Sequence, residues 1–245
     1  NAIVLRGAKP IFAEIDPITL NISASDVEKK ITSKTKAIYA IHYAGNACDI
    51  IKLKKIAKEN KLYLIEDAAH AYSAKFKSNY LGTIGDIGVF SFHETKNIIS
   101  GEGGALLINN KNFIERAEII REKGSDRKKF VRGEVDKYSW RDIGSSFLPG
   151  ETVAAFLFAQ LEEASNITSQ RLKIWHQYNE FFTSQDFSEF FSFPIVPETC
   201  SINGHLYYLL LKSNAERENF IKYMRVNKIH CIFHYIPLHN SEAGK

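Results

Sequence analysis

Cysteine is scarce in this chain of 245 residues. The three cysteines, Cys48, Cys200 and Cys231, lie far apart, form no Cys-x-x-Cys pair and leave an odd number. A disulfide framework or a structural zinc site needs paired or closely spaced cysteines, so the sequence favours neither. We therefore expect no metal site and a reducing, cytoplasmic environment.

Long apolar runs and a strong charge of one sign are also missing. No apolar run approaches the roughly 18 residues that span a bilayer, and the N-terminus lacks the basic-then-apolar layout of a signal peptide. The 32 basic and 28 acidic side chains give a formal net charge of +4, too small to indicate a nucleic-acid or membrane surface. With 44% hydrophobic residues, 14 glycines and 6 prolines, the composition is that of a globular protein.

An initiator methionine is missing as well. The chain begins with Asn1, and its one methionine is Met224. At the other end the chain stops just after an apolar stretch, where a natural terminus more often trails off in polar residues. We expect an internal fragment of a longer protein.

Short β-branched or aromatic runs alternate along the chain with segments of helical period. This pattern is typical of βαβ units and a mainly parallel sheet. Strands are predicted at 10–15, 37–42, 63–65, 88–92 and 105–108. Capping-box spacing at 25–28 predicts a short helix there, and apolar residues at 51, 53, 56 and 57 predict the apolar side of the next one. A further amphipathic helix is predicted around 114–120.

The character of the sequence changes after Gly150. Residues 152–178 form one long helical stretch, typical of a connector between domains. An aromatic-rich loop then leads to a predicted strand at 205–211, a helix at 215–226 and a strand at 231–235. The sequence therefore predicts a large domain at 1–150, a connecting helix at 151–182 and a small α/β domain at 183–245.

Chemically useful side chains gather in three runs: LIEDAAH at 64–70, GDIGVFSFHETK at 85–96 and GEGG at 101–104. In open α/β sheets, ligands lie outside the carboxyl ends of the strands. Asp67 and His70 follow one predicted strand, while Ser91 and Lys96 belong to another and the loop after it. We expect these four side chains to share one crevice.

Lys96 is the most informative of them. A lysine in a partly desolvated crevice has a lowered pKa and can attack a carbonyl carbon. Pyridoxal phosphate uses such a lysine together with a carboxylate for its pyridine nitrogen, which Asp67 could supply, and Ser91 could donate to the cofactor phosphate. Taken singly, Asp67 could equally be a helix cap and Lys96 a solvated lysine. Their joint order and spacing favour cofactor chemistry.

These runs, together with HETKN at 93–97, resemble the DegT/StrS-type nucleotide-sugar aminotransferases of the fold-type I pyridoxal-phosphate superfamily. The resemblance extends over essentially the whole chain. It implies a large α/β domain, in which helices lie on both faces of a mainly parallel sheet, and part of a small α/β C-terminal domain. It also implies that Lys96 is catalytic and holds the cofactor, and that Asp67 pairs with the pyridine nitrogen. His70 would lie near the cofactor ring and its phenolic oxygen, and Ser91 would bind the phosphate.

Three stretches, at 92–97, 132–146 and 233–239, are most similar to family members that aminate carbon 4 of a TDP-4-keto-6-deoxyhexose. These enzymes serve surface polysaccharides such as lipopolysaccharide and enterobacterial common antigen. The resemblance implies glutamate as amino donor, a nucleotide sugar as acceptor, and a homodimer in which residues 145–147 reach the partner's phosphate site. This chain departs from the family in having Ser145-Ser146 where many members have Tyr-Asn, and in lacking the Gly-Thr phosphate loop.

Two alternatives stay open at this point. A 3-aminotransferase or a dehydratase acting on another nucleotide keto sugar would share most of these residues, although such a dehydratase usually carries His in place of Lys96. The other alternative is a non-catalytic homologue, or a fragment that is inactive because parts of the site are missing. His42, which the family places near the active-site entrance, and His234 and His239 are either substrate contacts or histidines satisfied by packing.

Overall fold

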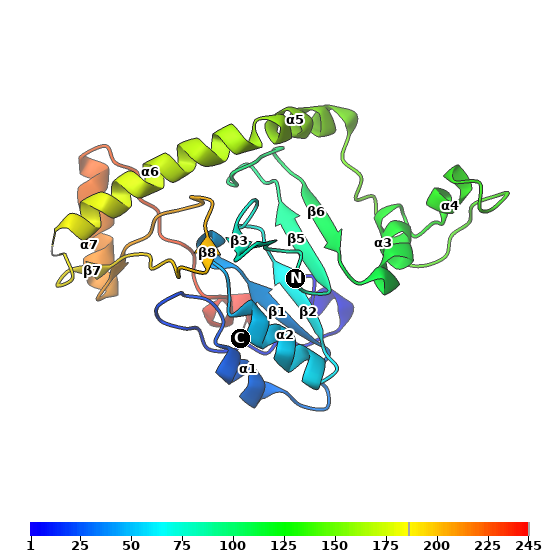
Figure 1. The fold of residues 1–245 in the computed structure, drawn as a ribbon, viewed down its shortest axis with the longest axis horizontal. Coiled ribbons are helices and arrows are strands. Elements are labelled where there is room, and N and C mark those ends of the chain that lie inside the picture. The colour runs from blue at the N-terminus through cyan, green and yellow to red at the C-terminus, as the bar shows by residue number, and fades with distance from the viewer. Residues whose placement is uncertain (186, 245) are drawn as a thin grey trace.

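A computed structural model describes residues 1–185 and 187–244; Asp186 and Lys245, both within the predicted small domain, lie outside the described residues. Four strands form the main sheet, in the spatial order β1 (Ala37–Ile41), β2 (Tyr63–Asp67), β5 (Ile87–Ser91) and β6 (Gly104–Ile108) (Figure 1). Strands β1, β2 and β5 run parallel, and β6 pairs antiparallel with β5. The predicted α/β fold is confirmed, and these strands begin at or next to the predicted residues.

Two helices, α1 (Ala24–Lys30) and α2 (Ile50–Glu59), close one face of this sheet. Strand β1 alternates between exposed and buried residues, and its buried Ile38 and Ala40 share a core with Leu64 of β2 and Leu53 of α2. The contact follows from the two periods, since a strand places every second side chain on one face and a helix every third or fourth.

Both helices differ in detail from the prediction. The N-cap of α1 is Ser23, whose hydroxyl accepts a hydrogen bond from the amide of Asp26, so the helix begins before residue 25. In α2 the buried residues lie at 50, 53, 56 and 57, and Ile51 is 52% exposed. Ile51 lies about 100° around the helix from Ile50, which turns it away from the sheet.

The remaining strands are short and form two small antiparallel sheets, in the orders β4-β3-β8 and β7-β9. Their bounds are Lys75–Phe76 (β3), Asn79–Tyr80 (β4), Phe191–Ser192 (β7), Cys200–Ser201 (β8) and Leu210–Leu211 (β9). The other helices are α3 (Ile114–Arg121), α4 (Arg127–Val131), α5 (Glu151–Glu162), α6 (Ala164–Ser184) and α7 (Asn214–Val226). Short 3-10 turns lie at Val4–Arg6, Tyr43–Gly45, Lys111–Phe113, Leu238–Asn240 and Glu242–Gly244.

Three predicted strands are absent or shortened within the described residues. Residues 10–15 form no strand and make a single bridge, between Ile15 and Ile22. The strand predicted at 205–211 is limited to its last two residues, and 231–235 is not paired. Apolar composition alone does not make a strand, because the backbone also needs a neighbouring strand to satisfy its hydrogen bonds. Ile232, which is 74% exposed, illustrates an apolar residue without such a setting.

The predicted single connecting helix is two helices, α5 and α6, which meet at Glu163. Buried Ala164, just after this junction, packs with Phe92 and Ile98 from the loop that follows β5. Together α5 and α6 run along one side of the molecule from the region of β6 to that of α7 (Figure 1). The junction thus anchors the long helical segment against the loop that carries Lys96.

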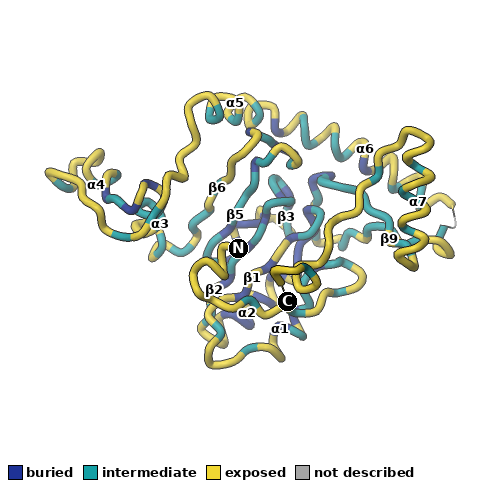
Figure 2. The backbone as a smooth tube through the Cα atoms, turned by 180° about the vertical axis from the view of Figure 1, so that it is seen from behind, coloured by how far each residue is buried: buried dark blue, intermediate teal, exposed yellow. Residues whose placement is uncertain are grey.

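The opposite face of β1 and β2 is open in the described part of the chain. Tyr39, Ile41 and Tyr63 on that face are 39%, 49% and 49% exposed. This differs from the expectation of helices on both faces. The lobe that carries α3 and α4 projects away from the sheet and is mostly exposed (Figure 2). None of the described helices is long and apolar enough to cross a membrane.

A fully buried carboxylate, that of Glu66, lies on the covered face of the sheet. It accepts a hydrogen bond of 2.9 Å from Nε2 of His42, which is also fully buried, and it accepts further bonds from the amides of Gly82, Ile84 and Gly85. Burial by itself raises the pKa of Glu66, but the hydrogen bonds from His42, Gly85 and Gly82 outweigh it and lower the pKa overall. The fully buried side chain of His42 is therefore satisfied by packing, which is one of the two alternatives left open for it.

Replacing Glu66 with Gln should lower the free energy of unfolding by about 3 kcal/mol, because an amide nitrogen would then face backbone N–H groups that need an acceptor. Urea unfolding measures this loss. The control is Glu59→Gln, at an exposed i, i+4 pair with Lys55, which should change stability by less than about 0.5 kcal/mol.

The stabilisation by Glu66 also has a defined pH dependence. Folding lowers its pKa below the ordinary 4.5, so the stabilisation is present above about pH 4.5 and is lost as the pH falls through the lowered value. If the stability difference between the parent chain and Glu66→Gln were the same at pH 7 and well below pH 4, this prediction would be contradicted.

Candidate active site

The side chain of Asp67 lies at the carboxyl end of β2, on the open face of the sheet. Its register partners are Ile41 of β1 and Val89 of β5. One carboxylate oxygen accepts a 2.9 Å hydrogen bond from the hydroxyl of Tyr39, and the other accepts one from the amide of Ala69. The residue thus closes a local turn and does not cap an α-helix, since no α-helix follows β2 directly in the described chain.

Lys96 lies in the loop between β5 and β6, and its backbone amide donates to the carbonyl of His93. Its side chain is half-buried. Burial lowers the pKa of this amine, and the negative charge of Asp67 opposes that shift. A larger fraction of the amine is therefore neutral near pH 7 than for a solvated lysine, and the neutral amine is the nucleophile.

His70 is half-buried, and the charges of Lys96 and Asp67 both act on its pKa. Burial, followed by the positive charge of Lys96 and the neighbouring His234, lowers the pKa of His70 to about 4, while Asp67 acts in the opposite direction. Its Nδ1 accepts a 3.3 Å hydrogen bond from the amide of Ala44, so the neutral ring carries its proton on Nε2. His70 is thus a neutral donor.

Ser91, the last residue of β5, is half-buried. Its hydroxyl accepts a 3.3 Å hydrogen bond from the amide of His93. The structure therefore ties this hydroxyl to the start of the Lys96 loop. Asp67, His70 and Lys96 are coupled to one another electrostatically, whereas Ser91 is connected only to Lys96, as the strand residue from which the Lys96 loop starts.

Aromatic rings from the C-terminal part of the chain also reach this edge. His234 accepts or donates a 2.7 Å hydrogen bond through Nδ1 to the hydroxyl of Tyr43, and its ring lies 5.9 Å from that of His70. His205 stacks on His70 with ring centroids 4.2 Å apart. His239, in contrast, packs against Phe12 and is exposed.

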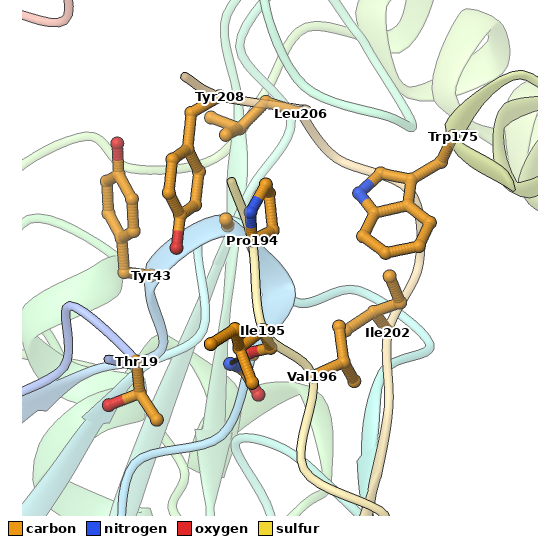
Figure 3. Close-up of a pocket in the computed structure, with 11 residues that line it drawn as sticks. Thr19, Tyr43, Trp175, Pro194, Ile195, Val196, Ile202, Leu206 and Tyr208 are labelled. Carbon is orange, nitrogen blue, oxygen red and sulfur yellow. Dashed lines mark hydrogen bonds between the residues drawn. The ribbon is translucent and has the colours of Figure 1, made fainter. Parts of the chain in front are cut away.

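An apolar cluster next to Tyr43 supports these rings. Tyr43 and Tyr208 lie side by side on one side of Pro194, and Trp175 of α6 lies on the other side (Figure 3). The hollow between them has a volume of about 10 Å³, room for a single water, so it is a packing gap. A larger hollow of about 480 Å³ lies near the first turns of α1 and α2, and Asp67, His70, Ser91 and Lys96 do not line it.

The sequence had not singled out Tyr39, His205 or the residues around them. For Tyr39 a signal existed, because it shares the odd-numbered face of β1 with Ile41, the register partner of Asp67. For His205 none existed, since its contact with His70 crosses from one end of the chain to the other. Across 1–185 and 187–244, His, Cys, Asp and Glu form no group of three or more that could hold a metal ion.

Known proteins of similar structure and sequence define the class to which this chain belongs. The fold is that of fold-type I sugar aminotransferases: the crystal structure of the aminotransferase TlmJ from Streptoalloteichus hindustanus matches with a TM-score of 0.88 at 26% identity, covering 100% of this chain and 64% of that one. The chain belongs to the DegT/DnrJ/EryC1/StrS aminotransferase family, whose sequence model matches residues 1–244.

Two relatives illustrate the range of the family. An uncharacterized protein from Methanocaldococcus jannaschii is 36% identical over 98% of this chain, which spans 63% of that protein's length. GDP-perosamine synthase from Escherichia coli O157:H7 is 38% identical over 75% of this chain and 49% of its own length. The cofactor of the family is pyridoxal phosphate, as the sequence predicted.

The side chains at this edge of the sheet fit that cofactor. An amine with a lowered pKa, a carboxylate with spare acceptor capacity and a neutral imidazole donor match its aldehyde, its pyridine nitrogen and its phenolic oxygen. Lys96, Asp67 and His70 supply these groups in that order.

Titration of the His70 imidazole by nuclear magnetic resonance should give a pKa near 4. Because Lys96 lowers and Asp67 raises this pKa, Lys96→Met should move it up and Asp67→Asn should move it down. Shifts of the same sign in both variants would show that His70 does not lie between these two charges.

Proposed function

We propose that the whole protein is a pyridoxal-phosphate-dependent aminotransferase that moves an amino group from glutamate to a keto sugar linked to a nucleotide. The observation that carries this proposal is the half-buried Lys96, whose pKa burial lowers, beside Asp67 and the neutral His70. Membership of the family supports it.

Each residue has a defined part in this proposal. The bound cofactor supplies an electron-accepting ring that stabilises negative charge on a substrate carbon as a proton leaves it. Asp67 keeps a proton on the pyridine nitrogen, and its hydrogen bond from Tyr39 holds the carboxylate in place. His70 donates from Nε2 to the phenolic oxygen, Ser91 donates to the phosphate, and the amine of Lys96 carries protons to and from the substrate.

For the acceptor we propose carbon 4 of a TDP-4-keto-6-deoxyhexose, used for a surface polysaccharide. A relative named dTDP-4-dehydro-2,3,6-trideoxy-D-glucose 4-aminotransferase, from Saccharopolyspora spinosa, supports carbon 4 at 28% identity over 98% of this chain. Two observations favour other acceptors. The similarity to GDP-perosamine synthase favours a GDP-linked sugar, and a relative named as a dTDP-3-amino-3,6-dideoxy-galactopyranose transaminase, 32% identical, favours carbon 3.

The acceptor is decided by incubating the protein with glutamate and, in turn, a TDP-linked 4-keto, a GDP-linked 4-keto and a TDP-linked 3-keto 6-deoxyhexose. We expect the largest kcat/KM for the first, with the new amine on carbon 4 by nuclear magnetic resonance of the product. Preference for the GDP-linked sugar by about tenfold or more would replace our nucleotide, and an amine on carbon 3 would replace our position.

The covalent site is tested by adding pyridoxal phosphate, reducing with borohydride and mapping the modified peptide by mass. We expect the label on Lys96, its loss in Lys96→Met, and its retention in Lys222→Met, which removes an exposed lysine of α7. Circular dichroism of both variants should match that of the parent chain, because neither lysine is in the core. A label of equal size in Lys96→Met would remove the basis of the proposal.

We also propose a homodimer, and the division into domains at 1–150, 151–182 and 183–245. Support for the dimer comes from apolar side chains on the projecting lobe: Trp140, Ile143 and Phe147 are 76%, 63% and 62% exposed. Exposed aromatic residues such as Trp140 and Phe147 are typical of protein interfaces. A second copy that covers this lobe would bring residues 145–147 of the first copy toward the phosphate site of the second.

Sedimentation equilibrium tests the dimer, with an expected mass near twice 27.8 kDa. Trp140→Ser and Phe147→Ser should each shift the population toward the monomer, since they remove apolar area from the interface. Val226→Ser, which changes an equally exposed apolar residue on α7, is the control and should leave the mass unchanged. A monomer in the parent chain would contradict the proposal.

A further inference from the structure

Residues 203–205 form a short segment without regular secondary structure, and three other parts of the chain hold it in place. Arg171 of α6 donates to the carbonyls of Gly204 and His205, at 3.2 and 2.7 Å. On the other side, the side-chain amide of Asn203 donates to the carbonyls of His70 and Tyr72, at 2.9 Å each. The segment therefore links α6 to the turn that follows Asp67.

The same segment is bonded to the residue that follows Lys96. The amide nitrogen of the Asn97 side chain donates to the carbonyl of Asn203 at 2.9 Å, and its oxygen lies 2.8 Å from Nδ1 of His205. Because an amide oxygen can only accept, Nδ1 of His205 carries the proton. Asn97 is 7% exposed, so its oxygen has little access to water as a replacement partner.

The ring of His205 makes a second, separate contact. It stacks on the ring of His70 with centroids 4.2 Å apart and an interplanar angle of 26°. The backbone here is tightly packed: a side chain at Gly45, whose φ is +81°, would run into the Asn203 side chain and the carbonyl of His70. One imidazole thus contacts both the residue next to Lys96 and the ring beside Lys96.

We propose that His205 is a positioning residue for the site: its Nδ1–H fixes the Lys96 loop through Asn97, and its ring fixes His70 by stacking. This proposal rests on the proposed function, in which Lys96 and His70 contact the cofactor. The two contacts use different parts of the imidazole, the ring nitrogen and the ring face. Substitutions can therefore remove them one at a time.

The charge state of His205 fits this part. Burial lowers the pKa of His205 to about 3, and repulsion from protonatable neighbours, which are His70, Lys96, Arg171 and His234, acts in the same direction. A protonated ring would keep the bond to Asn97 but place a cation against the amine of Lys96. The neutral ring holds both neighbours without adding charge to the site.

Two variants separate the contacts. His205→Asn can still donate to Asn97 from its amide nitrogen, which lies close to the position of Nδ1, but it cannot stack. His205→Phe keeps a ring over His70 and loses the donor. The matched controls are His230→Asn and His230→Phe, at an exposed histidine.

Two readouts are taken on the protein without cofactor. The first is the pH at which acetylation of Lys96 by acetic anhydride reaches half its maximal rate, followed by peptide mass. The second is the pH titration of the His70 imidazole by nuclear magnetic resonance. We expect His205→Phe to raise the Lys96 midpoint by about one pH unit, because water reaches a loosened loop, and to leave His70 unchanged. We expect His205→Asn to raise the His70 midpoint by a similar amount and to leave the Lys96 midpoint unchanged.

A purely structural role would shift both readouts together or neither, so parallel effects in the two variants, or effects no larger than those of the His230 controls, would overturn the proposal. If His205→Phe does not fold, Asn97→Ala removes the acceptor instead and should raise the Lys96 midpoint in the same way. Failure of the parent chain to form a borohydride-stable adduct at Lys96 would count against the proposed function, whereas an adduct with unmoved midpoints would count against the positioning role alone.

Discussion

The buried carboxylate of Glu66 is the constraint on which the rest of this structure depends. It binds the amides of Gly82, Ile84 and Gly85 near the carboxyl end of β2, which sets where the chain turns before entering β5. The same carboxylate binds His42, and through Nδ1 of His42 the amide of Cys48. A charge away from water must be fully hydrogen-bonded, so the segments that supply these donors have little freedom to lie elsewhere. Strands β1, β2 and β5 are thereby aligned at the edge where the functional groups lie.

Much of this arrangement could be predicted from the sequence. The strands of the main sheet and helix α2 carry clear periodic patterns, and the strand ends place Asp67 and Lys96 at one edge by topology alone. The strand expected at 231–235 failed because propensity says nothing about whether a partner strand is present. The break at Glu163 was equally invisible, since residues on both sides favour a helix.

The site itself was predicted only in its local part. Asp67, His70, Ser91 and Lys96 lie within about thirty residues of one another, and short motifs report such groupings. The contacts of His205 with Asn97 and His70 join positions separated by 108 residues or more. No periodicity or spacing rule reaches that far, because the path of the chain between these positions decides whether they meet. The structure adds this second layer, which holds the first in place.

The alternation of Glu66 and Asp67 along β2 has an evolutionary consequence. The two acids are neighbours in sequence but point to opposite faces, one into the core and one toward the site. Inserting or deleting a single residue within the strand would exchange their sides, burying the acid that we propose for the cofactor and exposing the one that organises the core. Length changes among descendants of this gene should therefore accumulate in the projecting lobe and be purged from β2.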